Sequence, residues 1–205
     1  MRAYVYWFLL VLLVFPLVAC ESAAEHIKQG DIYSTDKKWA LAIGEYSKAI
    51  GLDPKNAVAY NDRGFAYNSS GQRDSAIADF TKAIDLNPKY AVAYNNRGLA
   101  YIGLAYRQNA DYDDYHKALA DYDKAIELDP NYAVAYFNRG LAYIYVEDYD
   151  DAIPNYSKAI ELDPNYASAY YNRALAYRNK GDYDDAFTDY NKAIELDIAH
   201  PPIGR

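Results

Sequence analysis

Residues 133–166 read AVAYFNRGLAYIYVEDYDDAIPNYSKAIELDPNY, and residues 167–200 read ASAYYNRALAYRNKGDYDDAFTDYNKAIELDIAH. The two segments are adjacent and share the runs NR, LAY, DYDDA and KAIELD in the same register. Similarity at a fixed period is typical of a repeat architecture, in which each unit buries its apolar face against the next unit. This pair of segments therefore gives the register in which the rest of the chain is aligned.

The same period extends over most of the chain. A proline follows Leu-Asp or Leu-Asn at Pro54, Pro88, Pro130 and Pro164, with spacings of 34, 42 and 34 residues. Aligning on these prolines predicts repeats at 23–56, 57–90, 91–132, 133–166 and 167–200, followed by a tail at 201–205. The third repeat carries 8 extra residues, the excess of 42 over 34. Eight residues correspond to about two helical turns, so either a longer helical hairpin or a loop accounts for them.

Within each repeat, small and large residues recur at fixed positions. Positions are counted from the first residue of each repeat, leaving out the 8 extra residues of the third. Positions 8, 20 and 27 carry small residues, positions 4, 11 and 24 are aromatic in most repeats, and position 32 is proline in the first four. In the second repeat these residues are Tyr60, Gly64, Tyr67, Ala76, Phe80, Ala83 and Pro88. This pattern resembles the tetratricopeptide repeat. The resemblance implies an all-α fold, a right-handed superhelical solenoid of about five helix-turn-helix repeats over residues 23–200.

Two departures from the pattern concern single helices. Pro154 lies inside the second helix of the fourth repeat and predicts a kink there, because proline lacks the amide N–H. After the fifth repeat the sequence offers no polar capping helix, although terminal repeats normally need one. We therefore expect Phe187, Tyr190 and Ile194 to meet a partner or a second copy of the chain, or to be covered by the tail.

The N-terminal segment is a targeting signal by its composition. Residues 1–20 read MRAYVYWFLLVLLVFPLVAC, in which Arg2 precedes an uncharged stretch from Ala3 to Ala19. Its length fits either a signal peptide or a short membrane anchor. The run from Leu17 to Cys20 resembles the lipobox of bacterial lipoproteins.

That resemblance implies a signal peptide at 1–19, lipid, including palmitate, on Cys20, and a short tether at 20–22. An uncleaved anchor is the alternative. Two or more acyl chains hold a protein stably at a membrane without a spanning helix. By analogy with the family, Glu21 after the cysteine favours the outer membrane, facing the periplasm, because an aspartate there is associated with inner-membrane retention.

Composition excludes several kinds of chemistry. The chain has 21 Lys and Arg against 29 Asp and Glu, a net charge of −8, which disfavours a nucleic-acid partner. One cysteine and three scattered histidines indicate no disulfide, metal or cofactor site. The repeated Asp-Tyr-Asp runs fit helix N-termini, where acidic residues are favourable. We therefore expect no enzymatic activity. The excess of tyrosine, 25 residues, falls mostly at repeat positions.

The resemblance also implies a binding groove lined by the first helix of each repeat. Position 6 gives an amide ladder, and position 9 gives apolar side chains. Tyr145 and Tyr171 add aromatic rings that have no repeat role. The predicted groove residues are Asp62, Asn96, Asn138, Asn172, Phe65, Leu99, Leu141, Leu175, Tyr145 and Tyr171. Amides can pair with the backbone of an extended peptide. Alternatively, the asparagines solvate a helix face or bond across neighbouring helices.

A second ladder is expected to be structural. Arg63, Arg97, Arg139 and Arg173 occupy position 7, and we expect them to pair with carboxylates of the second helices, such as Asp79, Asp121 and Asp189. The function predicted overall is a lipid-anchored scaffold of the bacterial envelope that binds protein or peptide partners. The alternative is a structural subunit in pilus, secretion or outer-membrane assembly, acting through its uncapped C-terminal end and the insertion, with self-association left open.

Overall fold

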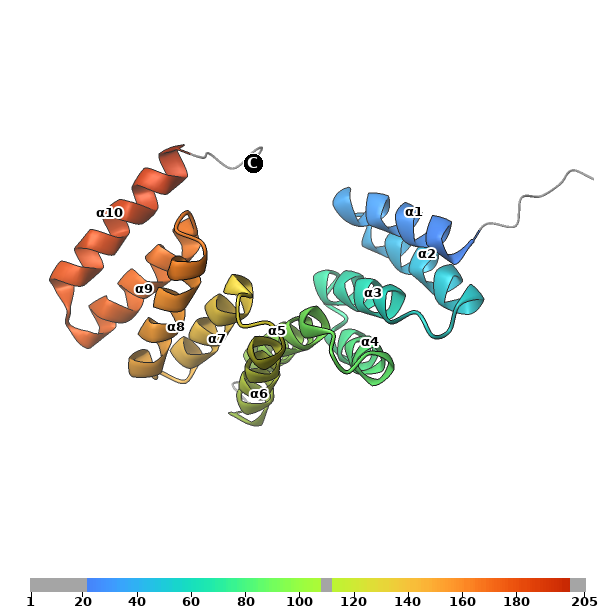
Figure 1. Cartoon of the computed structure of the whole chain (residues 1–205), viewed down its shortest axis with the longest axis horizontal. Helices are drawn as coiled ribbons and strands as arrows, with labels where there is room; N and C mark the ends of the chain where they lie inside the picture. Colours follow the sequence, from blue (N-terminus) through green and yellow to red (C-terminus); the bar gives the residue numbers. More distant parts are fainter. Residues whose placement is uncertain (1–21, 108–111, 200–205) are drawn as a thin grey trace, which may run out of the picture.

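The computed structural model describes residues 22–107 and 112–199 (Figure 1). The predicted signal peptide, Cys20, the start of the tether and the tail at 201–205 lie outside these residues. The described ranges contain ten α-helices and no strand. The helices are α1 Ala23–Thr35, α2 Trp39–Leu52, α3 Ala57–Ser69, α4 Arg73–Leu86, α5 Ala91–Arg107, α6 Tyr112–Leu128, α7 Ala133–Tyr145, α8 Tyr149–Leu162, α9 Ala167–Lys180 and α10 Tyr183–Ala199.

Consecutive helices form five hairpins that stack into a right-handed solenoid. Seen from the side, the stack is a crescent, with the first and last hairpins at its two raised ends (Figure 1). Each odd-numbered helix contacts the next odd-numbered helix, whereas no two even-numbered helices touch in the described part of the chain. The odd-numbered helices therefore line the inner, concave side. The all-α solenoid predicted from the sequence is confirmed.

The turn inside a hairpin needs a left-handed backbone at one position. Gly71 and Gly181 have φ of 83° and 90°, while Lys37 and Glu147 hold the same turn position with φ of 58° and 59°. Glycine takes this conformation without the steric cost that a Cβ adds. The turn can therefore be recognised from a glycine in two hairpins, whereas in two others the residue at the turn gives no such signal.

In each of the first four hairpins an aromatic ring of the second helix packs against a glycine of the first helix. A Cβ added to Gly64 would lie 2.8 Å from the Phe80 ring, and one added to Gly140 would lie 2.9 Å from the Tyr156 ring. Both rings are fully buried. Only glycine lets these two helices approach this closely, because added atoms in a packed core force the neighbours apart. The position 8 and position 24 residues thus form the centre of these four hairpins.

The extra residues of the third repeat lengthen its two helices. Helices α5 and α6 have 17 residues each, against 13 and 14 in the second hairpin. The added turns are packed, since Ile102, Ala105 and Tyr115 are buried in one apolar cluster that Val146 of the next repeat also contacts. For the described residues the structure therefore favours the helical hairpin over the loop, and residues 108–111 between the helices lie outside them. Helix α8 continues as one helix through Pro154.

Candidate functional site

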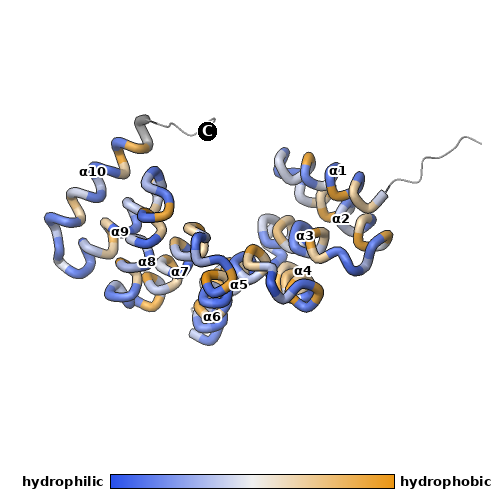
Figure 2. The backbone as a smooth tube through the Cα atoms, in the orientation of Figure 1, coloured by the Kyte–Doolittle hydropathy of each residue, from blue (hydrophilic) through white to orange (hydrophobic). Residues whose placement is uncertain are grey.

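The concave side of the solenoid carries the residues predicted for the groove. Figure 2 shows polar and apolar segments alternating along the helices, as expected when one side of a helix packs and the other meets solvent. The exposed apolar side chains on the odd-numbered helices include Val58, Val92 and Val134, at 47%, 37% and 40% exposure, and Phe65 and Leu99, at 42% and 36%. They recur at positions 2 and 9 of successive repeats. The face therefore presents apolar side chains at one-repeat spacing.

The predicted apolar series changes along the array. Leu141 and Leu175 occupy the same position as Phe65 and Leu99 but are only partly exposed. Position 2 ends in Ser168 on α9. The apolar part of the face is therefore centred on α3, α5 and α7.

The asparagines form a chain of hydrogen bonds across three helices. Asn138 Nδ2 donates to Asn95 Oδ1 at 2.9 Å, and Asn95 Nδ2 donates to Asn96 Oδ1 at 3.4 Å. Asn96 Nδ2 donates to Asn61 Oδ1 at 3.1 Å, and Asn61 Nδ2 donates to Asp62 Oδ1 at 3.0 Å. The chain runs from α7 through α5 to α3 and ends on a carboxylate. Of the two alternatives for the asparagines, the structure shows bonding across neighbouring helices.

This amide chain depends on position 5 as well as position 6. Asn61 and Asn95 at position 5 are 4% and 3% exposed, and Asn138 is 8% exposed. Asn61 and Asn95 were not among the predicted groove residues, although the consecutive polar residues at 61–62 and 95–96 were a visible signal. In the fourth repeat position 5 is Phe137, so Asn172 is outside the chain and donates to the carbonyl oxygen of Ser168 at 2.8 Å.

Asp62, at the end of the amide chain, lies in an environment that disfavours its charge. Burial raises the pKa of this carboxyl group to about 6, the nearby Asp31 adds to the shift, and the hydrogen bond from Asn61 opposes it. Asp31 itself accepts a hydrogen bond from the Tyr46 hydroxyl at 2.8 Å. A positive group placed beside Asp62 would restore its ionised form.

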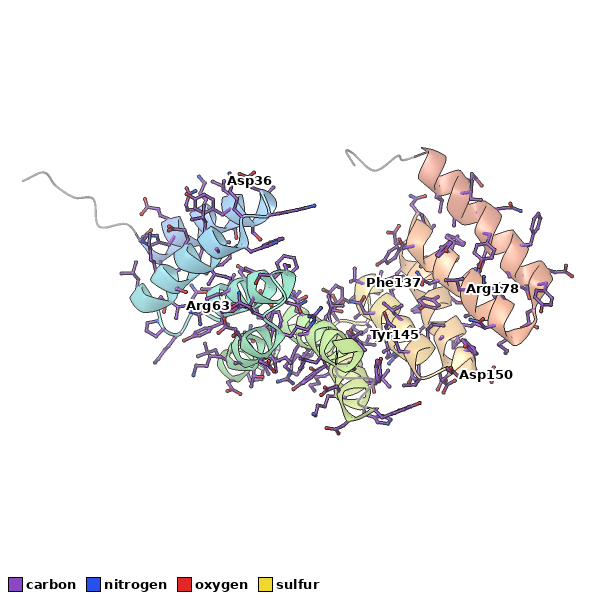
Figure 3. The ribbon with its side chains drawn as sticks, turned by 180° about the vertical axis from the view of Figure 1, so that it is seen from behind. Asp36, Arg63, Phe137, Tyr145, Asp150 and Arg178 are labelled. Carbon is purple, nitrogen blue, oxygen red and sulfur yellow. The ribbon has the colours of Figure 1, made fainter. Side chains whose placement is uncertain are left out.

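The two predicted aromatic residues lie in different settings. Tyr145, which Figure 3 labels, lies at the end of α7. Its ring stacks on Tyr115 of the lengthened α6, with ring centroids 5.7 Å apart. It therefore has a packing role that the repeat pattern did not suggest. Tyr171 is half exposed on α9 and meets the Tyr190 ring edge-on at 5.6 Å. It also lines a pocket of about 300 Å³ with Asn172 and Ile194 at the end of the array.

The arginine ladder has the predicted structural role. Arg63 donates from Nε and Nη2 to the two carboxylate oxygens of Asp79 at 2.7 and 2.8 Å, and from Nη1 to Ser47 Oγ at 3.1 Å. Arg63 thus links α3 to α4 and to α2 of the preceding hairpin. Figure 3 labels this arginine. Its guanidinium carbon also lies 5.6 Å from the Tyr60 ring centre and 5.8 Å from that of Tyr67.

The same clamp recurs along the chain. Arg97 pairs with Asp121 and Thr81, and Arg173 pairs with Asp189 and Ser157. These contacts confirm the predicted pairs. They also explain why tyrosine is frequent at positions 4 and 11, because aromatic faces there stabilise a buried cation.

In the fourth repeat the arrangement differs. Arg139 donates to Asn155 Oδ1 at 2.7 Å and to Asp123 Oδ1 at 2.6 Å.

Within residues 22–107 and 112–199, no three His, Cys, Asp or Glu side chains come together in an arrangement that could hold a metal ion. Among the same residues, no helix has the length and apolar character needed to cross a membrane.

Comparisons with known proteins agree with this architecture. Family models described as TPR repeat match residues 30–71, 66–104 and 103–144, and one described as Tetratricopeptide repeat matches residues 137–201. A crystal structure of MamA is 31% identical, covers 83% of this chain and 95% of its own, and has a TM-score of 0.70.

Two further solved structures have the same fold. TTC0263, a TPR protein from Thermus thermophilus, is 20% identical with a TM-score of 0.76, over 87% of this chain and 93% of its own. YrrB, described as a TPR protein with an unusual peptide-binding site, is 25% identical with a TM-score of 0.63, over 87% of this chain and 88% of its own. A comparison with curated protein sequences finds no match to the chain.

Proposed function

Because the chain belongs to the tetratricopeptide repeat family, we propose that it is a non-enzymatic scaffold that binds extended segments of partner proteins on its concave face. The observation that carries this proposal is the series of exposed apolar side chains on α3, α5 and α7, which includes Val58, Phe65, Val92, Leu99 and Val134. An extended peptide places alternate side chains on one side, where such a series can receive them. YrrB, which shares the fold, is described as having a peptide-binding site.

The hydrogen bonds of the amide chain all point the same way along this face. Its donors run from Asn138 towards Asp62, so the face ends in a carboxylate at the α3 side. A lysine or arginine of the bound segment is the natural partner of that carboxylate. Since burial raises the Asp62 pKa to about 6, we expect binding of a basic segment to weaken as the pH falls through 6, when this carboxyl group takes up a proton.

The test is a pair of substitutions of exposed leucines on opposite sides of the solenoid. An extended peptide is first selected for binding from a library, and its Kd is measured for Leu99→Ser on the concave face and for Leu41→Ser on α2. These leucines are 36% and 52% exposed. We expect at least tenfold weaker binding for Leu99→Ser, because the apolar contact is lost, and no change for Leu41→Ser. Equal effects of the two substitutions would contradict a groove on this side.

The proposed place of action is the bacterial envelope. The run Leu17-Val18-Ala19-Cys20 supports lipid attachment at Cys20 after removal of residues 1–19. Anchored in this way, in the outer membrane facing the periplasm, the array concentrates its partners close to the bilayer. Cys20→Ala should move the protein from the membrane to the soluble fraction. Membrane retention equal to that of the unchanged protein would refute lipid anchoring.

A second candidate function is that of an assembly subunit in pilus, secretion or outer-membrane assembly. The observation favouring it is the exposure of Phe187 and Ile194 on α10, at 69% and 57%, together with Tyr112 at 63% in the third hairpin. In that case Phe187→Ser would abolish assembly, while Leu99→Ser would leave it intact. The reverse pattern supports the groove.

A further inference from the structure

The last helix of the array presents a face that is covered in every earlier repeat. At position 21 the side chains of α2, α4, α6 and α8 are partly buried, whereas Phe187 of α10 is 69% exposed. At position 28 Ile84 is 8% exposed and Ile194 is 57% exposed. In the earlier repeats the next odd-numbered helix covers these positions. The exposed face of α10 is therefore equivalent to the faces of α2, α4, α6 and α8 that the next hairpin covers.

Those interfaces specify what kind of helix fits. In α3, α5, α7 and α9, two alanines seven residues apart have no exposed surface; the pairs are Ala59 and Ala66, Ala93 and Ala100, Ala135 and Ala142, and Ala169 and Ala176. Ala66 packs in one cluster with Ala42 and Tyr46 of the preceding hairpin. Small residues are needed there because the helices approach closely. A covering helix therefore requires alanine at both places.

An arginine between the alanines adds a polar contact. Arg63 and Arg173 each donate from Nη1 to a hydroxyl of the preceding even-numbered helix, Ser47 Oγ at 3.1 Å and Ser157 Oγ at 2.9 Å. The equivalent residue of α10 is Asn191, which is exposed and has an amide oxygen that can accept. Asp184, also exposed on α10, favours a positively charged incoming helix, whereas Glu195 is already paired with Lys192 at 3.0 Å.

An aromatic residue before the helix completes the pattern. Tyr166, three residues before Ala169, packs on Phe137 of α7, with ring centroids 4.9 Å apart. Tyr171 holds the position of Phe137 in the last repeat, and beside it lies the pocket of about 300 Å³. The pocket is thus placed where the ring of an incoming aromatic residue would lie.

The first helix of a second copy does not meet these requirements. Helix α1 has Glu25 and Ile32 where the other odd-numbered helices have the two buried alanines. Glu25 accepts a hydrogen bond from the backbone N–H of Ser22 at 2.6 Å in a capping box at the start of the helix. Docking α1 on α10 would bury the Glu25 carboxylate against the apolar face of α10, and burying a charge there costs free energy. Head-to-tail stacking of copies is therefore disfavoured.

We propose that α10 binds, from a partner protein, a helix of the pattern aromatic-x2-Ala-x3-Arg-x2-Ala. The aromatic ring enters the pocket beside Tyr171, the alanines lie against Phe187 and Ile194, and the arginine donates to the Asn191 amide oxygen. This surface lies at the end of the array and is separate from the concave face. The inference is thus independent of the proposed groove, and each can fail without the other.

The probe is a peptide that carries this pattern, namely residues 165–180 of the chain itself, NYASAYYNRALAYRNK. Its ends are blocked and a hydrocarbon staple joins positions 171 and 175, which lie on the helix side away from the buried alanines. Fluorescence anisotropy measures its binding to the full-length chain in detergent micelles. We expect Phe187→Ser and Ile194→Ser to weaken binding at least tenfold, while Leu41→Ser and Leu99→Ser leave it unchanged. Thermal melts check that the variants fold, which exposed positions should permit.

Variants of the peptide test the pattern itself. In the peptide, Ala169→Glu should abolish binding and Arg173→Ala should weaken it about fivefold, on the order of 1 kcal/mol. Equal binding by the Ala169→Glu peptide, or by the Phe187→Ser chain, overturns the proposal.

Two other occupants are distinguished in the same experiment. A tenfold gain in affinity on deleting residues 200–205 would mean that the tail already covers the face. If the chain forms a dimer and Phe187→Ser dissociates it, a second copy of the chain covers the face. Either result would overturn the proposal.

Discussion

The fourth and fifth repeats have closely related sequences and different surroundings. Helices α7–α8 and α9–α10 share the runs NR, LAY, DYDDA and KAIELD. Ile153 and Ile160 of α8 are partly buried under α9, whereas Phe187 and Ile194 at the same positions of α10 are 69% and 57% exposed. The difference shows that the burial of an even-numbered helix is decided by the next hairpin and not by its own sequence.

The two repeats also differ in their arginine clamps. Arg173 forms two hydrogen bonds with the buried carboxylate of Asp189, at 2.7 and 2.8 Å. Arg139 meets the neutral Asn155, and its charged partner is Asp123, whose side chain is 61% exposed. A buried ion pair costs much more to break than a pair in contact with water. The fifth repeat therefore depends more on its clamp than the fourth.

The largest expected effect comes from breaking the interface that covers the fourth repeat. Ala169→Glu places a charge where α9 lies against α8 with no exposed surface, and should cost about 3–5 kcal/mol of local stability. Hydrogen exchange should accelerate across residues 167–199. The matched control is Ser168→Glu, at an exposed neighbouring site in the same helix turn, which should leave exchange unchanged. Similar effects of both changes would mean that the interface does not hold the fifth repeat.

A smaller effect is expected from removing the clamps one at a time. Arg173→Ala leaves Asp189, only 5% exposed, without its cation and should cost about 3 kcal/mol, whereas Arg139→Ala should cost about 1 kcal/mol. Urea denaturation of the two variants measures the difference. Adding Asp189→Ala to the first variant should recover part of the loss, because no unpaired carboxylate remains. Equal losses for both arginines would refute the contrast between the two clamps.

The smallest effect is expected at the aromatic centre of the hairpin, with the opposite sign. The Tyr156 hydroxyl is buried without a hydrogen-bond partner, and phenylalanine holds the same position at Phe80. Tyr156→Phe should therefore stabilise the fourth repeat by up to about 1 kcal/mol. Tyr190 at the same position of the fifth repeat is only partly buried, and Tyr190→Phe should change stability by less than about 0.5 kcal/mol. A loss of thermal stability in Tyr156→Phe would show that the hydroxyl has a partner in solution.

Contacts inside one repeat could be anticipated from the pattern. Arg63 and Asp79 are separated by 16 residues in the sequence, as are Arg173 and Asp189, so a fixed register brings each pair together. The glycine at position 8 and the ring at position 24 follow the same rule. The family resemblance also indicates which helices line the concave side, and Leu99 lies exposed on one of them, α5.

Contacts between repeats were harder to anticipate. Asn138 reaches Asn95 across 43 residues, and Asn96 reaches Asn61 across 35. The rotation between successive hairpins decides which asparagine of one helix meets which asparagine of the next. The 8-residue insertion also changes the sequence separation between the third and fourth repeats. The stacking of Tyr145 on Tyr115 has the same origin, because it requires the lengthened α6.

The sequence by itself determined the all-α repeat fold, the helix pairs and the arginine clamps, because these follow from a period that local residues repeat. Only the tertiary structure decided which groups face solvent. It turned the asparagine ladder into a hydrogen-bonded chain, raised the Asp62 pKa through burial, and left the face of α10 exposed. Burial depends on the neighbour that covers a side chain, and in a solenoid that neighbour belongs to the next repeat.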